Sequence, residues 1–81
     1  MYNDNMLVAI WDDETIEHVA LNDITPDEVD HVLAHFEDRT VSRTTGRPIV
    51  FGYTEAGRYI AVVFEEIDEL NVLPITAYEV E

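Results

Sequence analysis

The chain of 81 residues carries 18 acidic residues against 4 basic ones, all of them arginines, which gives a formal net charge of −14. This charge argues against a general nucleic-acid-binding protein, because such proteins neutralise phosphates with lysine and arginine. The absence of cysteine excludes a disulfide framework, a thiolate nucleophile and a cysteine-based zinc site. Since 47% of the residues are hydrophobic, we expect a folded protein and not an acidic disordered tail.

The length predicts a single domain over residues 1–81, with residues 1–5 frayed. No apolar run approaches the roughly 18 residues that a membrane-spanning helix needs. The N-terminal stretch has no basic region and its apolar part is too short for a signal peptide. A cytoplasmic protein without membrane contact is the simplest expectation.

The first half of the chain predicts a short strand and a helix. Residues 7–11 form an apolar run that is typical of a strand or a strand-like lead-in. Asp12 and Asp13 supply an N-cap and an acidic first turn for a helix over about 13–21. Its expected apolar positions are Ile16, Val19 and Ala20.

The clearest local signal in the chain is the start of a second helix. Thr25, Pro26 and Glu28 combine an N-cap threonine, a proline at the first helical position and a glutamate at the third, which is a capping box. The spacing predicts a helix over about 26–36. One apolar stripe at helical spacing follows the cap, made of Val29, Val32, Leu33 and Phe36.

The second half of the chain reads as consecutive antiparallel strands joined by short turns. The expected strand segments are 40–44, 48–54, 59–67 and 71–78. The predicted fold is therefore α+β, with two N-terminal helices packed on one face of an antiparallel sheet of about four strands. Strand alternation places Arg47, Ile49, Phe51 and Tyr53 on one face, and Pro48, Val50, Gly52 and Thr54 on the other. Because both faces carry apolar groups, we expect part of the uncovered face to bind a partner.

A series of short motifs runs in a recognisable order along most of the chain. These are Ile10-Trp11-Asp12, the Thr-Pro-Asp-Glu-Val helix start at 25–29, Gly46-Arg47-Pro48, Phe51-Gly52-Tyr53-Thr54, Gly57-Arg58, Val62-Val63-Phe64 and Pro74-Ile75-Thr76-Ala77. Over about residues 10–80 this order resembles the BrnT family of small bacterial toxins. The resemblance implies a RelE-like fold, metal-independent endoribonuclease activity without a cofactor, and neutralisation by a co-encoded antitoxin.

The sequence departs from the family at several basic positions. Leu21-Asn22-Asp23-Ile24 stands where the family carries a Lys-His-Gly-like turn, Tyr53 replaces an arginine, and Thr76-Ala77-Tyr78 replaces a Ser-Ala-Arg ending. Arg47 and Arg58 match family arginines. Because RNA cleavage by such proteins relies on cations that stabilise developing charge, these departures favour the fold over the enzymatic activity.

Five residues are the candidate site. The resemblance nominates Arg47, Arg58 and Tyr78 as catalytic residues. Arg43, one of only four arginines, and Tyr53, expected on the uncovered sheet face, are the candidate RNA- or anion-binding residues. If the strand ends that carry Arg43, Arg47 and Arg58 lie close together, they form a cationic spot for a phosphate or a carboxylate. The alternative is that each arginine pairs with one of the abundant surface acids.

Tyrosines and histidines supply further candidates. Tyr53, Tyr59 and Tyr78 are expected to line the uncovered sheet face, where they would stack a base, anchor a protein partner or simply cover the sheet. His31 and His35 share one helix face, but the sequence places no third ligand beside them, so no metal site is predicted.

Three functions remain open at this point. The first is a diverged toxin-family protein that acts through contacts with a basic antitoxin-like partner or with itself as a homodimer. The second is an active ribonuclease in which Arg43, Arg47 and Arg58 hold the phosphate and Tyr78 replaces a basic catalytic group. The third is a stand-alone acidic interaction domain. The net charge of −14 disfavours RNA as the partner.

Overall fold

The computed structural model describes residues 7–80. The elements in chain order are β1 (Val8–Ala9), α1 (Asp13–Ala20), α2 (Pro26–His35), β2 (Asp38–Val41), β3 (Pro48–Tyr53), β4 (Tyr59–Glu66) and β5 (Asn71–Glu79). The prediction that residues 1–5 are frayed lies outside the described residues. Among those described, no helix is long and apolar enough to cross a membrane.

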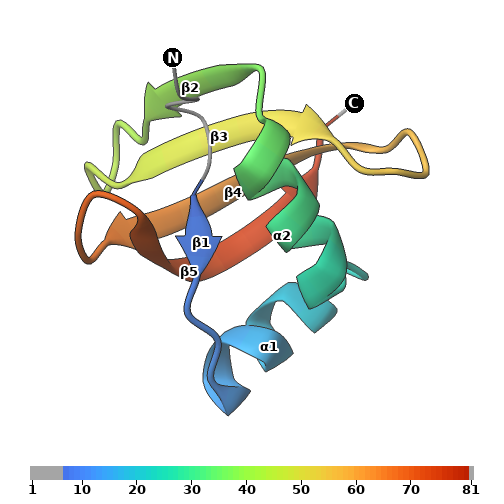
Figure 1. Cartoon of the computed structure of the whole chain (residues 1–81), viewed down its shortest axis with the longest axis horizontal. Coiled ribbons are helices and arrows are strands. Elements are labelled where there is room, and N and C mark those ends of the chain that lie inside the picture. The colour runs from blue at the N-terminus through green and yellow to red at the C-terminus, as the bar shows by residue number, and fades with distance from the viewer. Residues whose placement is uncertain (1–6, 81) are drawn as a thin grey trace.

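The sheet has five strands and mixed directions, in the order β1-β5-β4-β3-β2 (Figure 1). Strands β2 to β5 pair antiparallel as predicted. The predicted count of about four strands is one too low, because β1 returns to the sheet and pairs parallel with β5 through Val8 and Asn71. A parallel pairing needs a long connection between its two strands. Here the chain runs from β1 through both helices and strands β2 to β4 before it reaches β5. The apolar run at 7–11 does not indicate whether this strand pairs parallel or antiparallel with a neighbour.

The helix starts follow the predicted chemistry. The Asp12 side chain accepts a hydrogen bond from the Thr15 backbone N–H at 2.9 Å, and the Thr25 and Glu28 side chains form the expected capping box. In α1 the buried positions are Thr15 and Val19, whereas Ile16, a predicted apolar position, is 39% exposed. The Thr15 hydroxyl completes a second capping box, which explains why a polar residue is buried in that turn.

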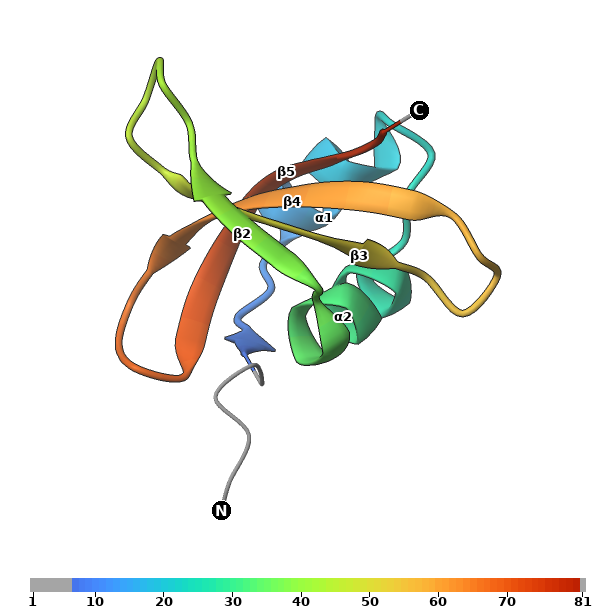
Figure 2. The same cartoon turned by 90° about the horizontal axis from the view of Figure 1, so that it is seen from above.

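The two helices occupy different places against the sheet. α2 lies across the sheet, and α1 lies beyond β5 (Figures 1 and 2). At the β5 side Asn22 Nδ2 donates to the Ala77 carbonyl oxygen at 2.8 Å, and His18 Nδ1 lies 3.3 Å from the Ile75 carbonyl oxygen. Of the two helices predicted to pack on one sheet face, α2 covers that face and α1 is hydrogen-bonded along β5.

A close approach between α2 and β3 fixes which sheet face is the core. A Cβ atom on Gly52 would lie 3.2 Å from the Phe36 Cα and 3.3 Å from the Val32 Cγ1. The side of β3 that carries Gly52 therefore faces α2. The core on this side includes Val29, Val32, Leu33, Val50, Ile60, Val62 and Phe64.

The opposite side of the sheet faces away from α2, and we call it the open face. Because paired residues share a face, the register assigns to it Asp38 and Thr40 of β2, Ile49, Phe51 and Tyr53 of β3, Tyr59, Ala61, Val63 and Glu65 of β4, and Leu73, Thr76 and Tyr78 of β5. The predicted alternation along β3 is confirmed. The open face is mostly apolar and aromatic, with acidic residues at its margins.

Candidate interaction surface

The candidate arginines do not gather into one cationic spot. The register pairs Ile49 with Val63 and Tyr53 with Tyr59, so Arg47 and Arg58 lie at opposite ends of the β3–β4 hairpin. At about 3.3 Å per residue the two positions are roughly 20 Å apart along the strands. The condition for a shared cationic spot is therefore not met by Arg47 and Arg58, because each arginine precedes a strand and consecutive antiparallel strands begin at opposite ends of the sheet.

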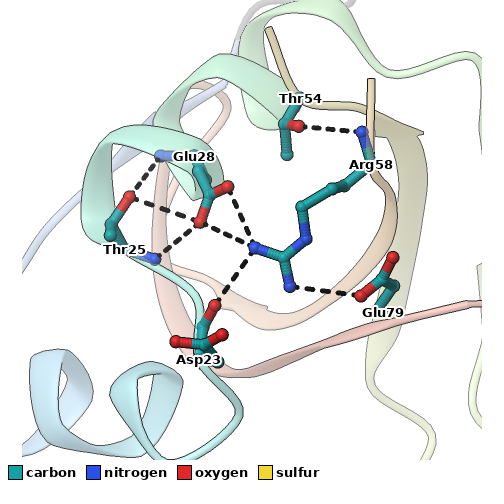
Figure 3. A network of polar contacts seen from close by, with 6 residues as sticks. All are labelled: Asp23, Thr25, Glu28, Thr54, Arg58 and Glu79. Carbon is teal, nitrogen blue, oxygen red and sulfur yellow. Dashed lines mark hydrogen bonds and ion pairs between the residues drawn. The ribbon is translucent and has the colours of Figure 1, made fainter. Parts of the chain in front are cut away.

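Arg58 is bound into a network that joins four parts of the chain (Figure 3). Its Nη1 donates to Glu28 Oε2 and to the Asp23 carbonyl oxygen, each at 3.1 Å, and its Nη2 donates to Glu79 Oε1 at 3.3 Å. The Glu28 carboxylate also accepts from the Thr25 backbone N–H at 3.0 Å, so one side chain caps α2 and binds the arginine. These contacts tie α2 and the α1–α2 turn to β5.

The environment of Arg58 keeps the guanidinium charged. Burial alone would lower the pKa of Arg58, but the hydrogen bond to Glu79 and the charges of Glu28 and Glu79 outweigh it, so this pKa lies above its ordinary value. The side chain is 27% exposed. With its donors directed at carboxylates and a carbonyl, Arg58 is placed as an internal clamp and lies on the side of the sheet away from Arg47.

Arg39 and Arg47 form more exposed ion pairs. Arg47 Nη2 lies 3.3 Å from Glu65 Oε2, and Arg39 Nη2 lies 2.9 Å from Glu66 Oε2. The Arg39 guanidinium also lies over the Phe64 ring, 5.7 Å from its centroid. Pairing with surface acids, the alternative predicted for the arginines, is confirmed for Arg47 and Arg58. Arg43 is exposed in the connection between β2 and β3.

Aromatic side chains form the centre of the open face. Tyr53 and Tyr59 pair directly across β3 and β4 with ring centroids 4.7 Å apart, and Phe51 stacks with Tyr59 at 6.3 Å and 17°. Tyr78 lies across from Ala61 on the neighbouring strand. Tyr53 is 52% exposed and Tyr78 is 41% exposed. The prediction that Tyr53, Tyr59 and Tyr78 line one face is confirmed.

Two carboxylates stand beside these aromatics. Asp38 of β2 lies directly across from Phe51, and Glu37 precedes it, with its backbone N–H donating to the Phe51 carbonyl oxygen at 2.9 Å. Burial, followed by the negative charges of Glu37 and Asp38, raises the pKa of the Tyr59 phenol above its ordinary value. The sequence prediction missed this acidic margin, although alternation continued into β2 would have placed Asp38 on the open face.

The five predicted site residues therefore divide into separate groups. Arg47, Tyr53 and Tyr78 belong to the open face, with Arg47 at one end beside Glu65. Arg58 belongs to the clamp on the other side, and Arg43 is exposed in the connection between β2 and β3. The His31 and His35 rings lie 4.7 Å apart, but within residues 7–80 no three histidine or acidic side chains converge on a point that could hold a metal ion.

Comparison with known proteins supplies no relative. No family model, curated protein or solved structure matches this chain. The resemblance to the BrnT family stays a prediction that rests on its motifs. The arrangement of the open face is the observation from which a function can be inferred.

Proposed function

We propose that this chain is a protein-binding domain whose open face docks a basic polypeptide, in the manner of a diverged BrnT-like protein that contacts an antitoxin-like partner. One observation carries the proposal: an aromatic cluster of half-buried Phe51 and Tyr59 and exposed Tyr53 lies beside carboxylates on a sheet face that points away from α2. The two helices and the run of antiparallel strands are compatible with the RelE-like fold that the resemblance implies.

The composition of the open face favours a protein partner. Tyrosines are enriched at protein interfaces because they bury a large apolar area and keep a polar end. Tyr53 and Tyr78 present such side chains at opposite margins of the aromatic cluster, and half-buried Val63 of β4 continues the apolar surface. An extended or helical segment of a partner laid on this face would cover them.

Charge complementarity favours a basic partner. The chain carries a net charge of −14, which would steer a cationic polypeptide toward it and speed their association. A second copy of the chain would bring the same negative charge to the interface, so the homodimer is the weaker candidate. A stand-alone acidic domain would use the same face with no dedicated partner.

An RNA-cleaving toxin remains the second candidate, because Arg47, Tyr53 and Tyr78 share the open face. A ribonuclease needs positive charge where it binds the RNA backbone, and this face offers little of it. Glu65 pairs with Arg47, and Asp38 stands beside Phe51, so negative charges lie where a phosphate backbone would run. Arg58, the other matched family arginine, is held in the clamp on the opposite side.

Amide chemical-shift mapping tests the proposal. An end-capped peptide of alternating arginine and valine is titrated into the intact chain, and its glutamate–valine counterpart serves as the charge control. We expect saturable shifts concentrated on β3, β4 and β5 at the open face, and none with the acidic peptide. The double variant Tyr53→Ser/Tyr78→Ser should weaken binding, whereas Leu21→Ser, which removes an 82% exposed side chain outside the open face, should not.

Two results would overturn the proposal. One is a set of shifts confined to the acidic surface of α1 and α2, which would indicate non-specific attraction to the charge. The other is the same affinity in the tyrosine double variant and in the wild type. Size measurements during the titration report whether a dimer of the chain is present instead.

A further inference from the structure

Five residues at the β2 side of the open face form a compact aromatic and acidic site. Phe51, Tyr53 and Tyr59 supply the rings, and Glu37 and Asp38 supply the carboxylates. We infer that this site receives an arginine side chain of the docked polypeptide. The inference rests on the proposed function and names the group that the open face recognises.

The rings are arranged to accept a flat cation. Tyr59 lies in the middle, nearly parallel to Phe51 with an interplanar angle of 17° and tilted by 51° from Tyr53. A guanidinium is planar and more weakly hydrated than an ammonium, so it stacks on aromatic faces at a lower desolvation cost. Tyr53, half exposed, offers a ring surface that solvent reaches.

The carboxylates are placed to complete the recognition. Asp38 lies across from Phe51 in the strand register, and its Oδ1 accepts from the Arg39 backbone N–H at 2.8 Å. Within residues 7–80 its Oδ2 has no hydrogen-bond partner. A guanidinium over the rings could donate to this oxygen and to the Glu37 carboxylate, which gives charge-assisted bonds in addition to stacking. Both acids already act on Tyr59, whose pKa is raised first by burial and then by their negative charges.

Arg39, Arg47 and Arg58 do not fill the site themselves. The Arg39 guanidinium lies on the other side of the sheet over Phe64 and pairs with Glu66. Arg47 pairs with Glu65, and Arg58 pairs with Glu28 and Glu79. An incoming cation would therefore meet two carboxylates and three rings without competition from these arginines.

The test compares peptides that differ only at the guanidinium. The alternating arginine–valine peptide is compared with versions that carry citrulline, a neutral analogue of the same shape, or lysine. We expect the arginine peptide to bind most tightly, followed by lysine and then citrulline. Replacing Tyr59 with leucine should weaken the arginine peptide about two- to five-fold, the range for one exposed cation–π contact, and leave the citrulline peptide unchanged. Tyr59→Phe keeps the ring and should keep the preference.

Two double variants with the same loss of charge distinguish the effect of the site carboxylates from that of the overall negative charge. Glu37→Gln/Asp38→Asn should reduce the preference for arginine over citrulline, whereas Glu14→Gln/Glu17→Gln on α1 removes the same charge and should keep it. The amide spectrum of each variant shows whether it is folded.

Each outcome has a defined meaning. A preference that survives both Tyr59→Leu and Glu37→Gln/Asp38→Asn, with peptide shifts still on the open face, overturns the arginine site and leaves the proposed function standing. The absence of open-face shifts with every peptide overturns both.

Discussion

Asp68 shows how a single residue shapes the surface of this molecule. In the turn between β4 and β5 its carboxylate accepts from the Asn71 side chain at 2.9 and 3.0 Å and from the backbone N–H groups of Asn71 and Leu70. The Asn71 side-chain bond is the largest cause of a pKa below the ordinary Asp value of 3.8. The sequence predicts a short turn between the strands at 59–67 and 71–78, but these bonds depend on the Asn71 side chain, three residues after Asp68.

Substitution of Asp68 with asparagine should destabilise the fold in a pH-dependent way. The Asp68 carboxyl has a lower pKa in the folded protein than in the unfolded chain, so its ionised form stabilises the fold. This stabilisation is fully present above the unfolded pKa of about 3.8. That contribution is lost as the pH falls through the folded pKa. The denaturant midpoints of the wild type and of Asp68→Asn should therefore differ most at neutral pH and converge in acid. Glu69→Gln serves as the charge-matched control, and a difference that stays constant into acid would refute this account.

Other residues of the candidate site show what alternation can and cannot predict. The period of two placed Arg47 and Tyr53 on one face, because successive side chains of a strand point to opposite sides. It could not say which face α2 covers, since both faces are apolar. That choice follows from Gly52, whose missing side chain lets the Phe36 backbone approach.

At the scale of elements, local signals predicted the helix boundaries well and the strand pairings less well. The strand expected at 40–44 lies at Asp38–Val41 instead. The capping box at Thr25 fixed the start of α2, because its two hydrogen bonds lie within one turn. The parallel return of β1 and the register shift between β4 and β5 depend on contacts distant in the sequence. The possible cationic spot was not formed for the same reason, because the distance between Arg47 and Arg58 depends on the antiparallel register of β3 and β4.

The clamp around Arg58 should matter more for stability than the exposed pair at Arg47. Arg58→Met leaves Glu28 and Glu79 facing each other without a cation and frees the Asp23 carbonyl, so we expect a clear drop in the urea midpoint. Arg47→Met breaks one exposed pair and should change the unfolding free energy by no more than about 1 kcal/mol. Equal effects of the two substitutions would contradict the assignment of Arg58 as a clamp.

At the scale of the whole molecule the acidic surface and the open face point to the same kind of partner. A net charge of −14 repels polyanions and attracts basic polypeptides, and the exposed rings supply apolar area where such a partner would dock. The fold class and the exposed tyrosines could be predicted from composition and alternation. The acidic margin of the aromatic site could not, because it forms only when β2 pairs with β3.

The most direct measurement compares RNA with the basic peptide on the same protein. The intact chain is titrated with a single-stranded RNA oligomer and with the arginine–valine peptide at about 0.15 M salt, where only nearby charges interact strongly, and the RNA is then examined for cleavage. We predict saturable binding of the peptide at the open face and intact, unbound RNA. RNA binding or cleavage that is lost in Arg47→Ala would contradict it and establish the ribonuclease.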